Sequence, residues 1–251
     1  MSRIEIPVLV VGGGPVGMMA GLLLDRMGLA SLVVERRDGP QRAPAAHVVS
    51  ARTFEICRQA GLDMESILGA AKDPKDAGHV NFVTRLSGDL IGRLPFEKQG
   101  DECFAHTPTP LRNLSQHHFE PILSSAFEDR EHTSLQYQMQ WESSEQGDSG
   151  IHSVLRNLAT DETVEVHSRY LIAADGAGSR VRTSLGIEMQ GPPRIQSFVM
   201  IHVGANLRSF VADRLGVLHF VMDPEASGCF IAHDLDREWV FMQNYDPDVE
   251  T

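Results

Sequence analysis

The stretch IEIPVLVVGGGPVGMMA, residues 4–20, decides the fold class of this protein. Residues 4–11 form a short, Val-rich apolar run, which is typical of a strand buried on both faces of a parallel sheet. Glycines follow, and from Pro15 to Met27 apolar residues recur three and four positions apart, as on one face of a helix. Residues 31–35 are a second apolar run. The order strand, glycine turn, helix, strand predicts a βαβ unit with a right-handed crossover.

The glycine turn contains the pattern Gly12-x-Gly14-x-x-Gly17 between a strand and a helix, the context that a dinucleotide-binding fingerprint requires. Gly12 permits a tight turn, Gly14 lets a pyrophosphate approach the backbone, and Gly17 allows close packing of helix on strand. Glu35 follows 18 residues after Gly17, where a carboxylate accepts hydrogen bonds from ribose hydroxyls and repels a 2′-phosphate. The pattern predicts a site for the adenosine end of NAD or FAD, and spacing does not choose between them. A glycine-rich turn in an unrelated α/β protein is the alternative.

A second motif, YLIAADGAGSRVR, begins at Tyr170. Its apolar strand delivers Asp175 to the edge of a sheet, and Gly176 frees the backbone to bend after it. This arrangement predicts an acidic turn beside a cofactor site. The residues alone leave open a simpler interpretation, in which Ser179 caps a short helix.

The rest of the chain alternates between helical and strand patterns. Helices are expected at 51–59, 64–71, 116–128 and 179–185, and strands at 79–94 (a hairpin turning at 87–89), 133–141, 151–158, 163–167, 170–174, 195–204, 215–222, 228–233 and 238–243. The segment 97–110 is expected to be a connecting loop. Strands after residue 190 are separated by Gly, Pro and Asp turns, so we expect an antiparallel sheet there. The sequence therefore predicts an α/β core with β-sheet material inserted at 79–94 and appended after 190.

Composition excludes several classes of partner and environment. The 251 residues carry 22 Lys plus Arg against 34 Asp plus Glu, a formal charge of −12 that disfavours nucleic acid and anionic membranes. Hydrophobic residues at 42% predict a folded globular protein. Three widely spaced cysteines, Cys57, Cys103 and Cys229, provide neither a disulfide framework nor a CxxC motif, which favours a cytoplasmic location. No stretch reaches the ~20 apolar residues of a membrane span, and we interpret 4–24 as mature fold.

Taken together, four stretches resemble one known family. They are Gly12-x-Gly14-x-x-Gly17 with Glu35, Ala174-Asp175-Gly176-x-x-Ser179-x-Val181-Arg182, PAAHVVSARTFE at 44–55 and NLSQHHFEPIL at 113–123. The first two resemble the class A FAD-dependent aromatic monooxygenases of the para-hydroxybenzoate and phenol hydroxylase type. The last two are similar to the phenol and polyketide hydroxylase branch. The resemblance extends over essentially the whole chain.

This resemblance implies a Rossmann-like FAD-binding βαβ core with an inserted and appended antiparallel β-sheet substrate domain. Its implied domains are 1–78 (first part of the FAD-binding domain), 79–110 (substrate-domain insertion), 111–190 (second part of the FAD-binding domain) and 191–251 (an incomplete substrate-domain sheet). Its implied cofactor-binding residues are Gly12, Gly13, Gly14, Pro15, Val16, Gly17, Glu35, Arg36, Arg52, Gln116, Asp175 and Gly176. Among these, the glycine turn would hold the FAD pyrophosphate, Glu35 the adenosine ribose and Gln116 the flavin side. Asp175 would serve both FAD and NAD(P)H.

The implied activity is hydroxylation of a phenolic or polyketide-type aromatic substrate. In the family, NADPH or NADH reduces the flavin, and O2 forms a flavin C4a-hydroperoxide that delivers oxygen to the ring. No catalytic triad and no metal site are expected, since adjacent His117 and His118 point about 100° apart on a helix. His202, His219 and His233 alternate on expected strands and are candidates for orienting the phenol, with a structural role as the alternative.

Two differences from the family pattern bear on the whole protein. The family's Pro-Arg-Ala is Pro44-Ala45-Ala46 here, so Ala45 replaces an arginine that engages NAD(P)H or flavin, and Arg42 is the available substitute. The family's third signature, Gly-Asp followed by Ala-Ala-His, is absent, because the Gly-Asp pairs at 88–89, 100–101 and 147–148 lie in expected turns or loops. We therefore expect a chain that lacks the C-terminal part and is completed by a partner segment or a homo-oligomer.

Two other functions remain open from the sequence. A truncated or split FAD-binding fragment without autonomous activity agrees with the missing signature. An NAD-dependent dehydrogenase agrees with the glycine fingerprint alone. The Asp175-Gly176 motif and the absence of a Tyr-x-x-x-Lys pair disfavour the dehydrogenase.

Overall fold

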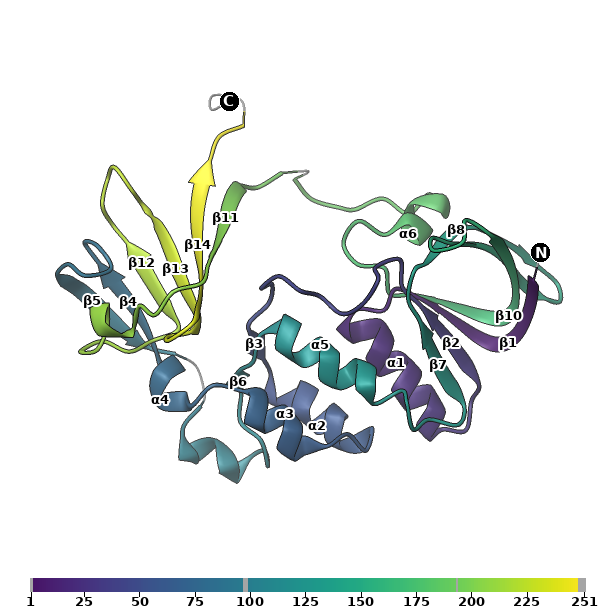
Figure 1. Cartoon of the computed structure of the whole chain (residues 1–251), viewed down its shortest axis with the longest axis horizontal. Coiled ribbons are helices and arrows are strands. Elements are labelled where there is room, and N and C mark those ends of the chain that lie inside the picture. The colour runs from purple at the N-terminus through teal and green to yellow at the C-terminus, as the bar shows by residue number, and fades with distance from the viewer. Residues whose placement is uncertain (1, 97–98, 193, 248–251) are drawn as a thin grey trace. The chain divides into compact units, whose positions relative to one another are not determined.

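The computed structural model describes residues 2–96, 99–192 and 194–247. Contacts along the chain divide it into two compact units. The first unit comprises Met1–Arg42, Cys57–Asp63 and His117–Gln190, and the second comprises Ala43–Ile56, Met64–Gln116 and Gly191–Thr251. Each unit has its own sheet, and Figure 1 labels most of the helices and strands of both.

Within the described residues, the first unit contains a six-stranded sheet in the order β7-β2-β1-β10-β9-β8. Its strands are β1 (Ser2–Val11), β2 (Ser31–Val34), β7 (Thr133–Gln136), β8 (Met139–Gly147), β9 (Gly150–Asn157) and β10 (Thr163–Ala173). The first four strands in that order run parallel, whereas β9 and β8 continue the sheet antiparallel. Helix α1 (Pro15–Arg26) connects β1 to β2, so the predicted βαβ unit and the α/β fold class are confirmed.

Alternation along the strands places apolar side chains on both faces of this sheet. Leu9 and Val11 pack with Leu32, Val34 and the ring of Trp141 in one buried cluster. The intervening side chains face the other way, as successive residues of a strand do, and α1 contacts β1, β2 and β7. Because both faces are covered, β2 is buried along its whole length, as its continuous apolar run predicts.

Two strand boundaries differ from expectation. The segments predicted at 163–167 and 170–174 form one strand, β10, because it pairs with β1 in a single register from Val164 to Ala173. The strand predicted at 133–141 is divided into β7 and β8, because Gln138 adopts a left-handed conformation with φ 57° between them. A left-handed residue interrupts the extended backbone of a strand. The chain therefore leaves β7 at one edge of the sheet and continues in β8 at the other edge.

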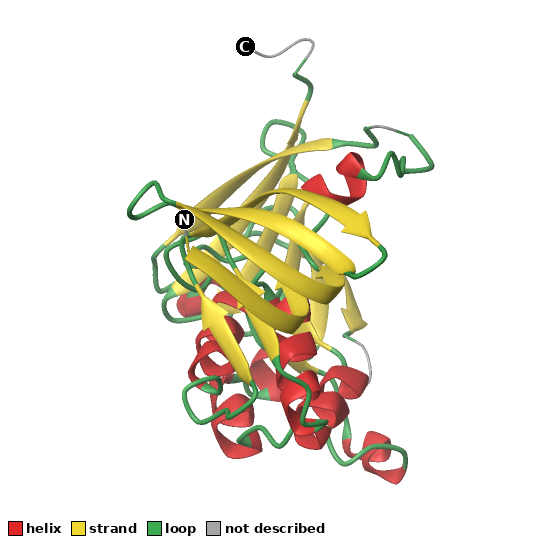
Figure 2. Ribbon diagram, turned by 90° about the vertical axis from the view of Figure 1, so that its right-hand side faces the viewer, coloured by secondary structure: helices red, strands yellow, loops and turns green. Residues whose placement is uncertain are grey.

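The second unit contains a six-stranded sheet in its described residues, ordered β11-β14-β13-β12-β4-β5. Its strands are β4 (His79–Val83), β5 (Leu90–Pro95), β11 (Ser197–Val203), β12 (Leu218–Val221), β13 (Gly228–Asp234) and β14 (Glu238–Tyr245). The inserted hairpin and the later strands thus share one sheet, and β4 pairs with β12 in parallel, which corrects the purely antiparallel expectation. A long connection between these strands permits parallel pairing. Figure 2 colours the strands of both sheets yellow and shows that they twist.

The remaining elements are short. They are β3 (Val48–Val49) paired with β6 (Arg112–Asn113), the helices α2 (Ala51–Gln59), α3 (Met64–Ala70), α4 (Pro74–Ala77), α5 (Gln116–Ser125) and α6 (Arg180–Ser184), and the 3-10 helices η1 (Asp101–Ala105) and η2 (Arg208–Phe210). The predicted loop 97–110 includes η1, and its first two residues lie outside the described residues. Among the residues that were searched, no helix is long and apolar enough to cross a membrane.

Candidate dinucleotide-binding site

The glycine turn between β1 and α1 requires glycine at two of its three motif positions. Gly12 has φ +107°, and a Cβ there would overlap the carbonyl oxygen of Ala174. A Cβ on Gly17 would overlap the carbonyl oxygen of Gly12. Side chains at either position would push the turn away from β10 or away from α1. These contacts explain the first and third glycines of the pattern within the protein itself.

The middle glycine is different, because the space that a side chain would occupy is open. A Cβ built on Gly14 would meet nothing within 4 Å. Gly14 is the N-cap residue of α1 and has no side chain to bond to the first-turn amides, and Pro15 and the exposed Val16 follow it. The helix start therefore presents oriented N–H groups and positive potential toward open space, which is the arrangement that binds phosphate oxygens.

Glu35 is positioned beside this turn at the end of β2. Its side chain is buried, and Oε2 accepts a 2.8 Å hydrogen bond from the backbone N–H of Gly13. Oε1 accepts bonds from the backbone N–H and from Nε of Arg37, at 3.0 and 3.2 Å. Burial alone would raise the pKa of Glu35, but these hydrogen bonds outweigh it and lower the pKa below its ordinary value. The carboxylate is thus ionised and fixed next to the glycine turn.

Two residues of this network, Arg37 and Glu120, were missed from the sequence. Glu120 lies in α5 with a fully buried side chain, and its Oε2 is 3.3 Å from Nη1 of Arg37. The neighbouring Arg36, which was predicted to bind cofactor, is exposed. A signal existed for both omissions. Arg37 is a basic residue only two positions after Glu35, and a glutamate on the apolar face of a helix implies a buried charge partner.

The second motif lies beside the first. Strand β10 pairs with β1, and a Cβ on Gly12 would come within 2.8 Å of the Cα of Asp175. The carboxylate of Asp175 accepts hydrogen bonds from Ser179 Oγ at 2.6 Å and from the backbone N–H of Arg180 at 2.7 Å. Gly176 has φ +84°, which turns the chain toward α6. The motif therefore anchors the start of α6 next to the glycine turn.

The structure also contains the simpler arrangement considered for this motif, in which Ser179 caps a short helix. Ser179 is the N-cap of α6, and its Oγ accepts a 2.9 Å hydrogen bond from the backbone N–H of Arg182. Asp175 thus has a structural task in the protein alone. A role toward FAD or NAD(P)H stays a prediction for this residue.

Arg52 and Gln116 belong to the second unit. Arg52 lies on α2 with an exposed side chain that pairs with Glu55 at 3.1 Å, and Glu55 also accepts a bond from Thr107 Oγ1 at 3.0 Å. The backbone N–H of Gln116, the first residue of α5, donates to the carbonyl of Ala46 at 2.8 Å. This bond ties the start of α5 to the segment that precedes β3.

The structure does not bring together the three histidines that were candidates for substrate contact. Strand register aligns His219 with Phe230 and Phe241, and His202 with Val240. Because cross-strand partners share a face and consecutive residues alternate, His202 and His219 lie on opposite faces of the sheet.

Their environments differ as well. His219 is fully buried, its Nε2 lies 3.2 Å from the carbonyl of Gly216, and burial lowers its pKa to about 4. His233 is buried against Ser115 Oγ at 2.6 Å. The ring of His202 is half-exposed and lies 3.1 Å from a carboxylate oxygen of Glu238. In the first unit, the ring centroids of His117 and His118 are only 4.0 Å apart. This is closer than expected for adjacent helical residues, whose side chains start out about 100° apart around the helix axis.

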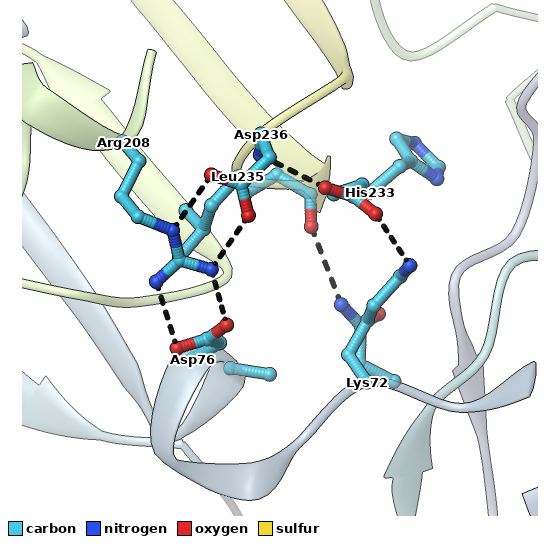
Figure 3. A pocket seen from close by; sticks show the side chains of 10 residues that line it. Lys72, Asp76, Arg208, His233, Leu235 and Asp236 are labelled. Atoms are coloured by element: carbon cyan, nitrogen blue, oxygen red, sulfur yellow. Dashed lines mark hydrogen bonds and ion pairs between the residues drawn. The ribbon is translucent and has the colours of Figure 1, made fainter. Parts of the chain in front are cut away.

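A cavity of about 70 Å³ in the second unit is lined by paired charges. Figure 3 shows the guanidinium of Arg208 between the carboxylates of Asp76 and Asp236, with bonds of 2.6 to 3.2 Å. Nearby, Lys72 pairs with Asp234 at 2.8 Å. These ion pairs join α4 and the segment before it to the end of β13. The cavity is small and its charges are satisfied by one another, so its role is structural.

The residues of the first unit are suited to the adenosine and pyrophosphate parts of a dinucleotide. The helix start faces open space at Gly14, the turn is held by glycines that admit no side chain, and an ionised carboxylate is fixed at the end of the second strand. These are the three elements that dinucleotide recognition in a βαβ unit requires. The site and the fold together define a dinucleotide-binding α/β protein.

Comparison with known proteins gives the family. Residues 5–251 match the model of the family described as "FAD binding domain", so the chain belongs to this family of FAD-binding monooxygenases, which includes the phenol and polyketide hydroxylases. The resemblance inferred from the motifs is confirmed.

Two curated relatives illustrate the range of the family. The chain is 35% identical over 231 residues to 2,4-dichlorophenol 6-monooxygenase of Cupriavidus pinatubonensis, an alignment that covers 88% of this chain and 37% of that enzyme. It is 30% identical over 254 residues to aklavinone 12-hydroxylase DnrF of Streptomyces peucetius subsp. caesius, covering 99% of this chain and 51% of that enzyme.

Among solved structures, the flavin-dependent monooxygenase PieE in complex with FAD and substrate superposes with a TM-score of 0.91 at 30% identity. The superposition covers 100% of this chain and 45% of PieE. The chain therefore spans about half, or less, of the length of the relatives it matches.

Proposed function

We propose that this chain provides the FAD-binding core of an NAD(P)H-consuming monooxygenase that hydroxylates a phenolic or polyketide-type aromatic substrate. The observation that carries the proposal is the glycine turn, in which two glycines are required by protein contacts and Gly14 faces open space beside the fixed carboxylate of Glu35. The names of the relatives, which are hydroxylases and monooxygenases of aromatic compounds, support the reaction class.

Each residue of the site has a proposed task. The amides that follow Gly14 bind the pyrophosphate, and Glu35 bonds to the adenosine ribose. Asp175 and Gly176 shape the turn beside them. FAD, when bound and reduced by NADH or NADPH, supplies the chemistry that transfers one oxygen atom of O2 to an electron-rich ring. The protein must hold the aromatic ring, exclude water and favour the phenolate.

Among the three candidate histidines, we propose His202 as the residue that contacts the substrate. Its ring is half-exposed and lies beside Glu238, whereas His219 is enclosed on the other face of the sheet. Exposure is needed for a side chain to reach a substrate. The other proposed site residues are Arg36, Arg52, Gln116 and His233. We also propose domain boundaries at residues 78, 110 and 190 and a cytoplasmic location.

The first experiment asks whether the chain binds FAD. The purified protein is mixed with FAD, and quenching of flavin fluorescence is titrated. We expect saturable binding, and bleaching of the bound flavin by NADH or NADPH without O2. Failure to bind FAD, also after addition of the C-terminal part of a relative carrying the Gly-Asp signature, would contradict the proposal.

A second candidate function is an FAD-binding chain without autonomous activity. It concerns the 251 residues taken by themselves, which align with 37% and 51% of the length of the two curated relatives. Here FAD would bind, but phenols and polyketide aromatics would not stimulate NAD(P)H oxidation. Stimulation of oxidation by an aromatic compound, with formation of a hydroxylated product, favours the first function over this one.

A further inference from the structure

The segment that carries Glu35 and Arg37 is held rigidly by its backbone. The N–H of Glu35 donates to the carbonyl of Gln136, and the carbonyl of Glu35 accepts from Met139, both at 2.9 Å. Two residues further, the backbone N–H of Gln138 donates to the carbonyl of Arg37 at 2.8 Å. With the backbone fixed on the β7–β8 junction, the direction of the Glu35 carboxylate depends on what its side chain contacts.

The Arg37 side chain makes one of those contacts, beside the backbone N–H groups of Arg37 and Gly13. Its Nε donates to Glu35 Oε1, and its Nη1 donates to Gln41 Oε1 at 2.8 Å and lies 3.3 Å from Glu120 Oε2. Burial would lower the pKa of Arg37, but the hydrogen bond to Glu35 and the charges of Glu35 and Glu120 raise it. One guanidinium thus joins two carboxylates, one beside the glycine turn and one inside α5.

Glu120 is the buried end of this arrangement. Its side chain has no exposed surface, and Oε2 also accepts a 2.6 Å hydrogen bond from the backbone N–H of Gln41. A buried carboxylate is costly unless it is paired and hydrogen-bonded. Gln41 and Arg37 supply these partners, so Glu120 holds the guanidinium in the orientation that reaches Glu35.

We propose that Glu120 and Arg37 are positioning residues for the adenosine end of FAD, acting through Glu35. This inference rests on the proposed function, because it assumes that Glu35 bonds to the adenosine ribose. Glu120 anchors Arg37, Arg37 fixes Oε1 of Glu35, and Oε2 is held toward Gly13 beside the phosphate site. Without the anchor, the partly exposed guanidinium turns to solvent, and Oε1 of Glu35 keeps only its hydrogen bond from the backbone N–H of Arg37.

The test uses Glu120→Gln, which preserves shape and a hydrogen-bond acceptor for Gln41 but removes the charge that anchors Arg37. We expect FAD to bind about tenfold more weakly, the loss that one charge-assisted hydrogen bond accounts for. FMN, which has no adenosine, should bind the variant and the unchanged protein equally. A general structural defect would weaken both flavins, so the FAD-to-FMN ratio isolates positioning.

A double-mutant cycle gives the second readout. If Glu120 acts through Glu35, then Glu120→Gln should cause no further loss of FAD affinity in a Glu35→Gln background. Glu128→Gln is the matched control, since Glu128 is exposed and the charge change is the same. Equal FAD affinity of Glu120→Gln and the unchanged protein, or additive losses in the cycle, would overturn the inference. Absence of FAD binding by the unchanged protein would instead contradict the proposed function.

Discussion

At the scale of single residues, the glycine motif separates into positions that serve the protein and a position that serves a ligand. Gly12 and Gly17 are required by the carbonyl oxygens that they approach, whereas a side chain on Gly14 would meet no protein atom within 4 Å. Sequence spacing treats the three glycines as one pattern. The structure assigns them different tasks, and these tasks can be tested separately.

Alanine substitution distinguishes the two kinds of glycine. Gly17→Ala should lower the free energy of unfolding by about 1–3 kcal/mol, because its Cβ overlaps the Gly12 carbonyl. Gly14→Ala should leave that free energy within about 0.5 kcal/mol, since its surroundings are open, yet weaken FAD binding at least tenfold. Urea unfolding and flavin-fluorescence titration measure the two effects. Normal FAD binding by Gly14→Ala would contradict the proposal that the FAD pyrophosphate lies against Gly14.

His219 predicts a pH dependence of stability. Burial lowers its folded-state pKa to about 4, whereas a histidine in the unfolded chain has a pKa of about 6.5. As pH falls from about 6.5 to 4, the unfolded state binds a proton that the folded state does not. Stability contributed by neutral His219 is therefore complete above this range and is lost through it, by roughly 3 kcal/mol.

The measurement is urea unfolding at several pH values. We expect His219→Gln to show a smaller loss of stability between pH 6.5 and 4 than the unchanged protein, even if it is less stable at pH 7. The exposed His106→Gln is the control and should keep the full slope. An unchanged slope in His219→Gln would show that this histidine is not the group responsible.

At the scale of elements, α6 shows how a short helix is held in place by the residue that precedes it. Its five residues, Arg180–Ser184, are too few for a helix to be stable alone. Asp175 and Ser179 bond to the first amides and satisfy donors that would otherwise be unpaired. The motif thus has a structural function that is independent of any cofactor.

Substitutions at the cap should therefore affect local stability before they affect chemistry. Ser179→Ala should cost about 1 kcal/mol, the usual contribution of an N-cap. Asp175→Ala should cost more, because it removes acceptors for Ser179, Arg180 and Val181. Asp175→Asn retains one acceptor oxygen and should lie between the unchanged protein and Asp175→Ala. Hydrogen exchange of residues 179–186 measures the effect, and equal protection in all variants would contradict it.

Strand pairing in the second unit was partly predictable. The hairpin of β4 and β5 was expected from its turn residues, and the later strands were expected from alternation. The parallel pairing of β4 with β12 was not, because the pattern within a strand specifies its faces but not its neighbour. Pairing between strands so far apart depends on how the intervening chain packs.

At the scale of the whole molecule, the edge strand β11 exposes apolar side chains on both faces. Phe198, Val199, Met200 and Ile201 are each 40–51% exposed, and β11 is the last strand on its side of the described sheet. Such an edge is a site for association with other chains.

A charge on this edge should reduce self-association of the purified chain. We expect Val199→Lys to lower light scattering during incubation at high protein concentration, because lysine on an edge strand opposes edge-to-edge pairing. Val199→Thr keeps the shape without the charge and serves as control. Both should unfold at urea concentrations close to that of the unchanged protein. Equal scattering of Val199→Lys and Val199→Thr would show that this edge does not drive association.

The sequence by itself determined the βαβ unit, the glycine turn and the place of Glu35, because each depends on residues close together in the chain and on the regular period of strands and helices. Only the tertiary structure decided that Arg37 meets Glu120, that Gly12 meets Ala174, and that β4 lies beside β12. These contacts join residues more than 80 positions apart in the chain, and burial and hydrogen bonding select them only when the whole chain is packed.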